Sequence, residues 1–305
     1  MKIAFMGTPA LAVPCLDALA AHHEIAIVVS QPDKVGGRGH KLIAPPVKQR
    51  ALEIGAPVLQ PQRARDESFI EELRAFAPDA IAVVAFGQIL PQAILDMAPR
   101  GCVNLHYSLL PRWRGAAPVQ YAIWNGDKTT GVTTQWMAAK LDAGDIIQQV
   151  EVPIENGETS DELFPRLNAI GARVLVETFA MLENGQAPRV SQDENAVTLA
   201  PQIDKDDAKI EWTMSAERIV NTARAWSAWP VAWCLYQDAP LKICRAQTVD
   251  ASGEAGTILA LDKVGPILAA GEKTVQLLEV QAPGKPRMNA ADWARGARLE
   301  IGAKF

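Results

Sequence analysis

A carboxamide and an imidazole stand two residues apart where an apolar run of the chain gives way to a loop. Asn104 and His106 lie at the end of the run Cys102–Leu105, and side chains two apart in a strand point to the same face. Such a pair could donate hydrogen bonds to a developing oxyanion, and the imidazole could also move a proton. The alternative is that His106 is a hydrogen-bonded structural histidine, which is the simpler interpretation of an isolated histidine.

A carboxylate that could complete this set lies further along the chain. Residues 141–145 read Leu-Asp-Ala-Gly-Asp, and the small residues Ala143 and Gly144 allow close approach of the backbone to a ligand. Taken alone, Asp142 or Asp145 would be a turn former. No group of residues has the spacing of metal ligands, so we expect no catalytic metal.

These side chains need a scaffold, and the first half of the chain alternates short apolar runs with stretches of helical period. The predicted strands are Lys2–Met6, Glu24–Ser30, Pro57–Leu59, Ala80–Ala85 and Cys102–Leu105. The predicted helices between them are Ala10–Ala21, Val47–Ile54 and Ser68–Phe76. Strands that are apolar throughout are buried on both faces, as in sheets of right-handed βαβ units. We therefore predict an open, mostly parallel, Rossmann-like α/β sheet that binds ligands at the carboxyl edge of its strands.

The next elements complete this first domain, and those after them predict a second, smaller one. Two longer strands, Gly131–Met137 and Ile146–Ile154, flank the aspartate loop, and a helix follows from the capping box at Thr159 and Glu162 to Leu182. A helix at 215–225 then precedes five short strand-like runs at 232–236, 241–246, 256–261, 266–269 and 275–280, which favour a small OB-like β-barrel. We predict a catalytic domain over 1–188, a linker over 189–206 and a barrel over 207–305.

Composition excludes several classes of protein. The 305 residues are 49% hydrophobic and 21% charged, which is typical of a globular chain and not of a disordered or collagen-like one. The longest apolar stretch, Ala80–Phe86, is far shorter than the roughly 20 residues that span a bilayer. The four cysteines form no C-x-x-C pair, so we expect reduced thiols in a cytoplasmic protein.

A basic, glycine-rich loop stands out in a chain whose net charge is −5. Between residues 32 and 50 a single acid, Asp33, is accompanied by Lys34, Arg38, Lys41, Lys48 and Arg50, with glycines at 36, 37 and 39. Such a loop could order against a phosphate backbone, with Arg38 stacking on bases or binding phosphates through its planar fork. A solvated surface loop is the alternative.

Several motifs along the chain together resemble those of one enzyme family. Residues 104–118 read Asn-Leu-His-Tyr-Ser-Leu-Leu-Pro-Arg-Trp-Arg-Gly-Ala-Ala-Pro, and residues 141–145 form the Leu-Asp-x-Gly-Asp loop. Both are similar to the signature of the folate-dependent formyltransferases. Further similarities are Gly-Thr-Pro at 7–9, Gln-Pro-Asp at 31–33, Gly-Gly-Arg-Gly at 36–39 and Ala-Phe-Gly-Gln-Ile-Leu-Pro at 85–91. The resemblance covers essentially the whole chain. The sequence departs from the family pattern at Tyr107, where many members have glycine.

The resemblance implies the formyltransferase fold and a reaction. The formyl group of 10-formyltetrahydrofolate would be transferred to the free amino group of methionine carried by initiator tRNA, giving the formylated tRNA used in translation initiation. Asn104, His106 and Asp142 would be the catalytic set: the first two would donate hydrogen bonds to the oxyanion of a tetrahedral intermediate. Asp142 would orient His106 and favour its imidazolium form, with a water relaying the proton.

The resemblance also implies the binding residues and partners. The residues expected to bind the folate are Phe86, Gly87, Gln88, Ile89, Leu90, Ser108, Leu109, Leu110 and Pro111. Those expected to contact tRNA are Lys34, Arg38, Lys41, Arg112 and Arg114, and the barrel would add contacts to the tRNA backbone. Neither a membrane nor a protein partner is implied, and we expect a monomer.

Three other functions remain open. The same three residues would serve transfer to another amine, such as a glycinamide ribonucleotide or an amino sugar nucleotide. A hydrolase would release formate from the folate without any acceptor. A non-catalytic RNA-binding module is the third, although Asn104, His106 and Asp142 argue against it.

Overall fold

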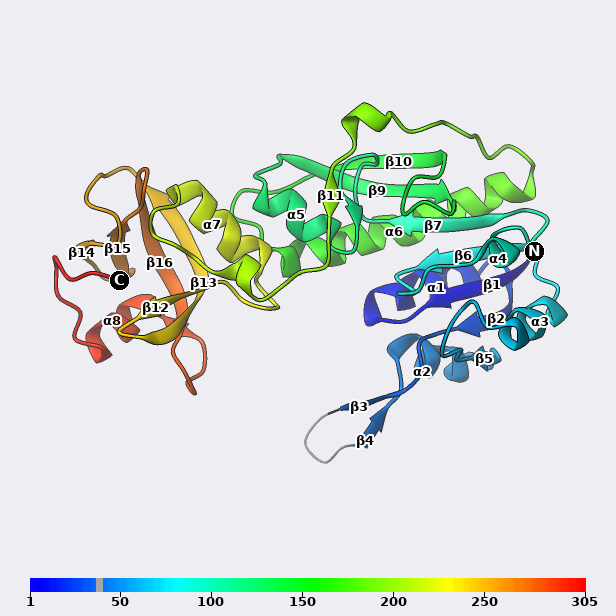
Figure 1. Ribbon diagram of the computed structural model, residues 1–305, viewed down its shortest axis with the longest axis horizontal. Coiled ribbons are helices and arrows are strands. Elements are labelled where there is room, and N and C mark those ends of the chain that lie inside the picture. Colours follow the sequence, from blue (N-terminus) through cyan, green and yellow to red (C-terminus); the bar gives the residue numbers. More distant parts are fainter. Residues whose placement is uncertain (37–40) are drawn as a thin grey trace. The chain divides into compact units, whose positions relative to one another are not determined.

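The computed structural model describes residues 1–36 and 41–305 (Figure 1), which divide into two compact units. The first unit comprises residues 1–115, 131–152 and 165–199, and the second comprises residues 116–130, 153–164 and 200–305. These units cut across the predicted division into 1–188, 189–206 and 207–305. Two segments of the predicted catalytic domain, 116–130 and 153–164, group with the C-terminal residues.

The first unit is built on a seven-stranded sheet in the order β10-β9-β7-β6-β1-β2-β5. Its strands are β1 (Lys2–Gly7), β2 (Glu24–Val29), β5 (Val58–Leu59), β6 (Ala80–Val84), β7 (Cys102–His106), β9 (Thr129–Trp136) and β10 (Ile146–Pro153). Five strands, from β7 to β5 in the sheet, run parallel, and β9 pairs antiparallel with β7. The predicted open, mostly parallel sheet is therefore confirmed.

Helices pack on this sheet because its strands are apolar on both faces. The helices described within residues 1–115 are α1 (Val13–Ala20), α2 (Pro46–Glu53), α3 (Glu67–Ala75) and α4 (Gln92–Leu95), with a 3₁₀ turn at Ala10–Ala12. Met6 and Val83 pack in one cluster with Phe69 and Leu73 of α3 and Ile94 of α4. The parallel pairing of β6 with β7, in which Val83 is opposite Asn104, places the carboxyl ends of the two strands side by side.

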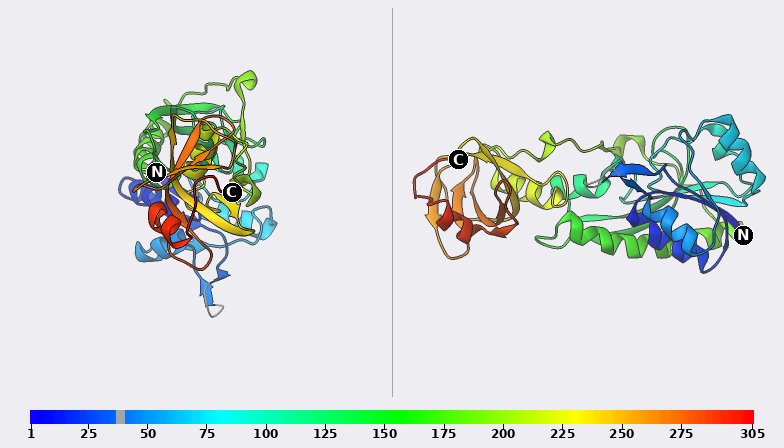
Figure 2. Two further views of the ribbon diagram at one scale, coloured as in Figure 1. Left: turned by 90° about the vertical axis from the view of Figure 1, so that its left-hand side faces the viewer. Right: turned by 90° about the horizontal axis from the view of Figure 1, so that it is seen from below.

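The long helix α6 (Ser160–Glu183), green in Figures 1 and 2, supports the strand that carries Asn104 and His106. It begins at the predicted capping box, where the Thr159 amide donates to Glu162 at 2.9 Å. Gly171 lies so close to β7 that an added Cβ would be 2.9 Å from Leu105. The Tyr107 hydroxyl, which donates to Asn168 at 2.8 Å, also points toward α6. Tyr107 therefore packs on the face of the strand opposite His106.

A hairpin that the sequence pattern did not predict follows β2. Its strands are β3 (Lys34–Gly36) and β4 (Lys41–Ile43), and it projects from the first unit in Figure 1 and in the left view of Figure 2. Three of its apolar side chains are exposed by more than half: Val35, Leu42 and Ile43. Arg38, together with Gly37 and Gly39, lies outside the described residues.

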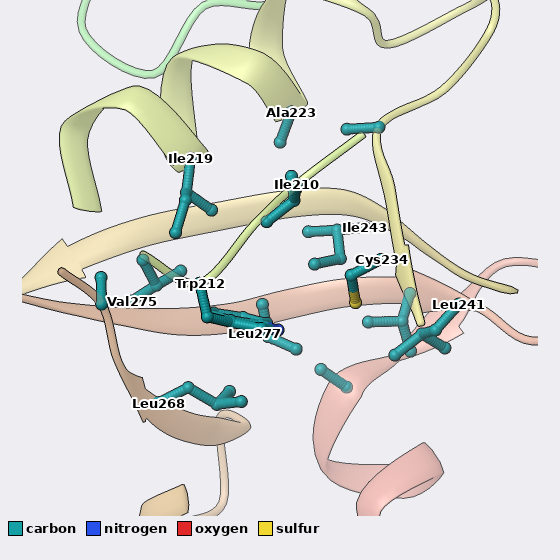
Figure 3. Packing of buried hydrophobic residues seen from close by; sticks show 14 of the residues in the cluster. Ile210, Trp212, Ile219, Ala223, Cys234, Leu241, Ile243, Leu268, Val275 and Leu277 are labelled. Atoms are coloured by element: carbon teal, nitrogen blue, oxygen red, sulfur yellow. The ribbon is translucent and has the colours of Figure 1, made fainter. Parts of the chain in front are cut away.

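The second unit contains a curled antiparallel sheet in the order β12-β13-β16-β15-β14, with β17 paired to β16. The strands are β12 (Trp233–Tyr236), β13 (Ala239–Val249), β14 (Ile258–Leu261), β15 (Pro266–Ala269), β16 (Thr274–Gln281) and β17 (Met288–Asn289), and α8 (Ala290–Gly296) follows. Figure 3 shows its core, in which Ile219 of α7 (Ala216–Ala225) faces Ile243, Val275 and Leu277 of the sheet. The predicted small C-terminal β domain is confirmed, as a curled sheet.

An aromatic cluster explains why residues 116–130 group with the C-terminal part of the chain. Helix α5 (Pro118–Trp124) carries Tyr121 and Trp124, whose rings lie 5.6 and 5.8 Å from the ring of Trp226 at the end of α7. Arg218 places its guanidinium carbon 3.3 Å from the centre of the Trp124 ring, a cation–π contact. Because this cluster forms between segments about a hundred residues apart, sequence periodicity does not reveal it.

The predicted linker over 189–206 is largely ordered against the first unit up to Leu199. It contains a 3₁₀ turn at Glu194–Ala196 and the short strand β11 (Leu199–Ala200). Alongside it lies β8 (Arg114–Gly115), and the Arg114 amide donates to the Thr198 carbonyl at 2.9 Å. A further 3₁₀ turn lies at Asp206–Ala208.

Two general properties concern membranes and thiols. Among the helices of the described residues, none is both long and apolar enough to cross a bilayer. Cys15, Cys102, Cys234 and Cys244 are all buried and unpaired. Burial raises the pKa of the Cys15 thiol to about 12, which leaves it uncharged at neutral pH.

Replacement of Trp226 by alanine tests the aromatic cluster. Trp226 is completely buried, so Trp226→Ala should lower the free energy of unfolding by about 3–5 kcal/mol. Trp229→Ala is the matched control, because Trp229 is 54% exposed and its loss should change stability by about 0.5 kcal/mol or less. Urea unfolding of both variants checks this, and equal losses of stability would contradict the proposed packing.

Candidate active site

The end of β7 presents Asn104 and His106 on one face of the sheet, between β6 and β9. In the antiparallel register with β9, Asn104 is opposite Gln135 and His106 is opposite Thr133. Asn104 is half-buried, and within the described part of the chain its carboxamide has no hydrogen-bond partner. A polar group placed in this way is available to a ligand.

The imidazole of His106 is buried, with 6% of its surface exposed, and is held by one nitrogen. Its Nε2 lies 2.8 Å from the carbonyl oxygen of Trp113. A carbonyl oxygen only accepts hydrogen bonds, so Nε2 must carry the hydrogen and donate. Nδ1 is therefore the ring nitrogen that can take up a further proton, and it lies 3.8 Å from Oδ2 of Asp142.

The carboxylate of Asp142 is held on both oxygens. Oδ2 accepts from the Gly115 amide at 2.9 Å, and Oδ1 accepts from the Gln135 side chain at 3.1 Å. Asp142 has φ 47°, in the left-handed region, and Trp113 has φ 63°. Such conformations cost about 1–3 kcal/mol and persist where surrounding contacts impose them, often at functional sites.

The three residues predicted as a catalytic set thus lie together at one sheet edge. Asn104 and His106 share a face, and Asp142 approaches Nδ1 of His106 from the 141–145 loop. Asp145 is directed elsewhere, toward the Ser191 hydroxyl, which donates to it at 3.2 Å. The arrangement can donate hydrogen bonds to a ligand oxygen and exchange one proton at Nδ1.

The 141–145 loop is anchored by side chains that sequence reasoning did not select. Gln135 binds Asp142, and the Nε2 of Gln192 donates to the carbonyls of Asp142 and Gly144 at 2.9 and 2.7 Å. Its position in the predicted strand Gly131–Met137, next to the aspartate loop, was a usable signal for Gln135. Gln192 lies in a polar segment without periodicity, so no comparable signal existed for it.

Arg114 differs from the expectation that it contacts RNA. The residue is only 3% exposed, and its guanidinium donates to Gln192 at 2.8 and 3.0 Å and to Glu194 at 2.8 Å. Glu194 also accepts from Lys140 at 2.6 Å. The hydrogen bonds from Arg114 and then Lys140 lower the pKa of Glu194 to about 2, so this carboxylate stays ionised in mildly acidic solution. Arg114 is thus a buried internal contact.

The residues expected to bind folate divide by exposure into a buried group and a group that is exposed or half-buried. Ser108, Leu110, Phe86 and Leu90 are buried. Ser108 donates to the Arg112 carbonyl at 2.6 Å and so braces its own loop. Ile89 is 83% exposed, Gly87 is exposed, and Gln88, Leu109 and Pro111 are half-buried.

The loop after β6 is held in an unusual backbone conformation. Ala85, which is exposed, has φ 48°, and Gly87 has φ 85°. The Phe86 carbonyl accepts from the Thr8 hydroxyl at 2.9 Å and from Gln31 at 3.2 Å. Gln88 accepts from the Ala64 amide at 2.6 Å, so its side chain anchors the loop and leaves Ile89 projecting.

Of the remaining residues expected to contact tRNA, Lys34 and Arg112 are exposed, and the backbone of Lys41 pairs with Gly36. Arg112 places its guanidinium carbon 5.0 Å from the centre of the Trp113 ring. Arg38 is outside the described residues. Among the described residues there is no cluster of three or more His, Cys, Asp and Glu side chains that could hold a metal ion.

Replacement of Gly144 tests whether the aspartate loop must hold its position. An added Cβ would lie 1.6 Å from the Trp136 carbonyl oxygen, so Gly144→Ala must displace the loop that carries Asp142. A shift of about 1 Å in a reacting group typically costs a hundredfold in rate. We expect a loss of turnover of that order with the fold retained. Gly296→Ala, which meets no atom within 4 Å, should keep full turnover. Near-normal turnover of Gly144→Ala would contradict the assigned role.

Comparison with known proteins adds a family assignment. A family model described as "Formyl transferase" matches residues 1–179, and one described as "Formyl transferase, C-terminal domain" matches residues 202–298. A protein of Moorella thermoacetica named methionyl-tRNA formyltransferase is 47% identical, covering 97% of this chain and 96% of its own. Its namesake in Geobacillus thermodenitrificans is 46% identical, covering 100% and 97%.

Solved structures share the fold at low sequence identity. An N-formyltransferase from Helicobacter canadensis, in complex with folinic acid and dTDP-3-aminofucose, superposes with a TM-score of 0.69 at 16% identity, covering 91% of this chain and 99% of that one. HypX from Aquifex aeolicus, in complex with tetrahydrofolic acid, superposes with a TM-score of 0.65 at 14% identity. The match covers 99% of this chain and 48% of the HypX chain.

Proposed function

We propose, because the chain belongs to the formyl transferase family, that it transfers the formyl group of 10-formyltetrahydrofolate to the amino group of methionine on initiator tRNA. Two relatives named methionyl-tRNA formyltransferase match it over nearly its whole length at 46% and 47% identity. The observation that carries the chemistry is the convergence of Asn104, His106 and Asp142 at the carboxyl edge of β7.

The role of Asn104 follows from its lack of another partner. The folate donor supplies a formyl carbon, and attack of an amine on that carbon leaves a negatively charged oxygen. The Asn104 carboxamide is on the face that carries His106 and is free to donate a hydrogen bond to that oxygen. A preorganised donor of this kind stabilises the charge without reorganisation of the protein.

His106 provides the site for proton transfer. Its Nε2 is fixed on the Trp113 carbonyl, so Nδ1 would take the proton from the attacking nitrogen and return one to the departing nitrogen of the donor. A free α-amino group titrates near 7.7–8.0, and esterification of the carboxyl lowers that further, so no strong base is needed. The Asp142 carboxylate, 3.8 Å from Nδ1, would stabilise the imidazolium directly after a small approach or through a bridging water.

The folate would lie against the exposed and half-buried members of two loops. Ile89 and Leu109 offer apolar surface for a flat ring, and the backbone at Ala85 and Gly87, held in the left-handed region, offers peptide groups to its polar edge. Solved structures of similar fold with tetrahydrofolic or folinic acid support this proposal. Ser108 and Leu110 would act by shaping the loop.

Lys34, Lys41, Arg38 and Arg112 would contact the tRNA. We exclude Arg114 from this set because its guanidinium is buried on Gln192 and Glu194. The hairpin β3–β4 flanks Arg38, which would present its planar guanidinium to phosphates or unpaired bases. The four buried, unpaired cysteines support a location in the reducing cytoplasm.

Removal of His106 tests the proposed chemistry. With 10-formyltetrahydrofolate and charged initiator tRNA, the wild-type protein should form N-formylmethionyl-tRNA, and without an acceptor it should release no formate. His106→Ala should lower kcat by about 10²–10⁴-fold, because proton transfer is lost. His22→Ala, at an exposed site, is the matched control and should retain full activity. Formate release that needs no acceptor would instead identify a hydrolase.

Replacement of Arg38 tests the tRNA contact. Arg38→Ala should raise the KM for charged tRNA about tenfold and leave the Kd for the folate unchanged, because the lost contact is to nucleic acid alone. Its activity should also depend less steeply on salt concentration, since one phosphate contact is missing. Arg74→Ala, on the exposed surface of α3, should change neither constant. An equal effect on folate and tRNA would argue against the assignment.

A further inference from the structure

A single carboxamide, that of Gln192, joins the two segments that hold His106 and Asp142. Its Oε1 accepts from Nε and Nη2 of Arg114 at 3.0 and 2.8 Å. Its Nε2 donates to the carbonyls of Asp142 and Gly144 at 2.9 and 2.7 Å. An amide oxygen has two acceptor positions and an amide nitrogen has two hydrogens, so all four positions are used.

The arginine end of this connection acts on both members of the acid–base pair. Arg114 lies between Trp113, whose carbonyl accepts from His106, and Gly115, whose amide donates to Asp142. The position of residues 113–115 therefore sets the 3.8 Å between Nδ1 and Oδ2. Because the Arg114 side chain is buried, its contacts with Gln192 and Glu194 fix that backbone.

The amide end acts on the aspartate loop. Its two acceptors, the carbonyls of Asp142 and Gly144, flank Ala143 in the turn that places the carboxylate. Gln135, which binds Oδ1 of Asp142, lies 3.3 Å from the same Nε2 through its own Oε1. A second tie runs from Arg114 through Glu194 to Lys140, just before the loop.

We propose that Gln192 is a positioning residue for the formyl transfer, which sets the distance and orientation between Asp142 and His106 by joining Arg114 to the 141–145 loop. This inference rests on the proposed function of the same site. Residue 192 lies between the stretches matched by the two family models, which end at 179 and begin at 202. The segment that follows α6 thus belongs to the active site.

The required chemistry is specific to glutamine. Glutamate would keep the acceptors for Arg114 but lose both donors and place a negative charge beside two carbonyl oxygens. Asparagine would be one methylene too short to span the two segments. Methionine would retain the approximate shape without any of the strong hydrogen bonds.

The test compares Gln192→Glu and Gln192→Met with Gln186→Glu, which makes the same charge change at an exposed position. We expect both Gln192 variants to lower kcat about ten- to hundredfold, with the KM values for folate and tRNA within about twofold of wild type. Gln186→Glu should match wild type. Thermal unfolding of each variant shows whether the loss of kcat exceeds any loss of folded protein. If Gln192→Glu does not fold, Gln192→Met provides the readout.

A second readout does not depend on activity. The chain has four histidines with two ring nitrogens each, so ¹⁵N-histidine-labelled protein gives few ring-nitrogen NMR signals, and the signals lost in His106→Ala are those of His106. The His106 signal should shift in the Gln192 variants and stay in place in Gln186→Glu. An unmoved signal with kcat within twofold of wild type would overturn the inference. A wild-type protein without formyl transfer would instead overturn the proposed function, whatever the NMR result.

Discussion

Two backbone atoms, the carbonyl oxygen of Trp113 and the amide nitrogen of Gly115, determine how an imidazole and a carboxylate meet at the edge of this sheet. The first fixes Nε2 of His106 at 2.8 Å and the second fixes Oδ2 of Asp142 at 2.9 Å. Neither interaction requires a particular side chain at the residue that supplies the backbone atom. Both require that three consecutive residues keep one conformation, including a tryptophan in the left-handed region.

The rest of the first unit can be understood as support for that conformation. Helix α6 packs closely on the back of β7, where a Cβ added at position 171 would lie 2.9 Å from the Leu105 side chain. On the front, the register of β9 brings Gln135 beside Asn104, from where it reaches Asp142. The buried guanidinium of Arg114 holds residues 113–115 in place through its hydrogen bonds to Gln192 and Glu194. The preorganised geometry thus comes from backbone hydrogen bonds and from side chains that hold His106 and Asp142 without reacting themselves. Enzymes commonly fix their reacting groups in this way.

Much of this could be predicted from the sequence, because several signals were local. Period-two alternation placed Asn104 and His106 on one face, continuous apolar runs indicated a parallel sheet, and a capping box located the start of α6. What could not be predicted depends on contacts between distant segments. The pairing of α5 with α7, the burial of Arg114 and the reach of Gln192 to the aspartate loop all join residues more than 45 positions apart. An arginine next to a candidate site suggests surface charge, and only the fold shows that it is covered.

The ordered course of residues 189–199 has a consequence for building chimaeric enzymes. A stretch rich in polar residues between the two matched family domains invites the exchange of one carboxyl-terminal domain for another at that point. In this protein, an exchange point placed soon after α6 would replace residues 189–199, which run beside β8. The replacement would also change the residue that contacts the Arg114 guanidinium. A junction downstream of Leu199 keeps residues 189–199 together with the aspartate loop and β8, which they contact.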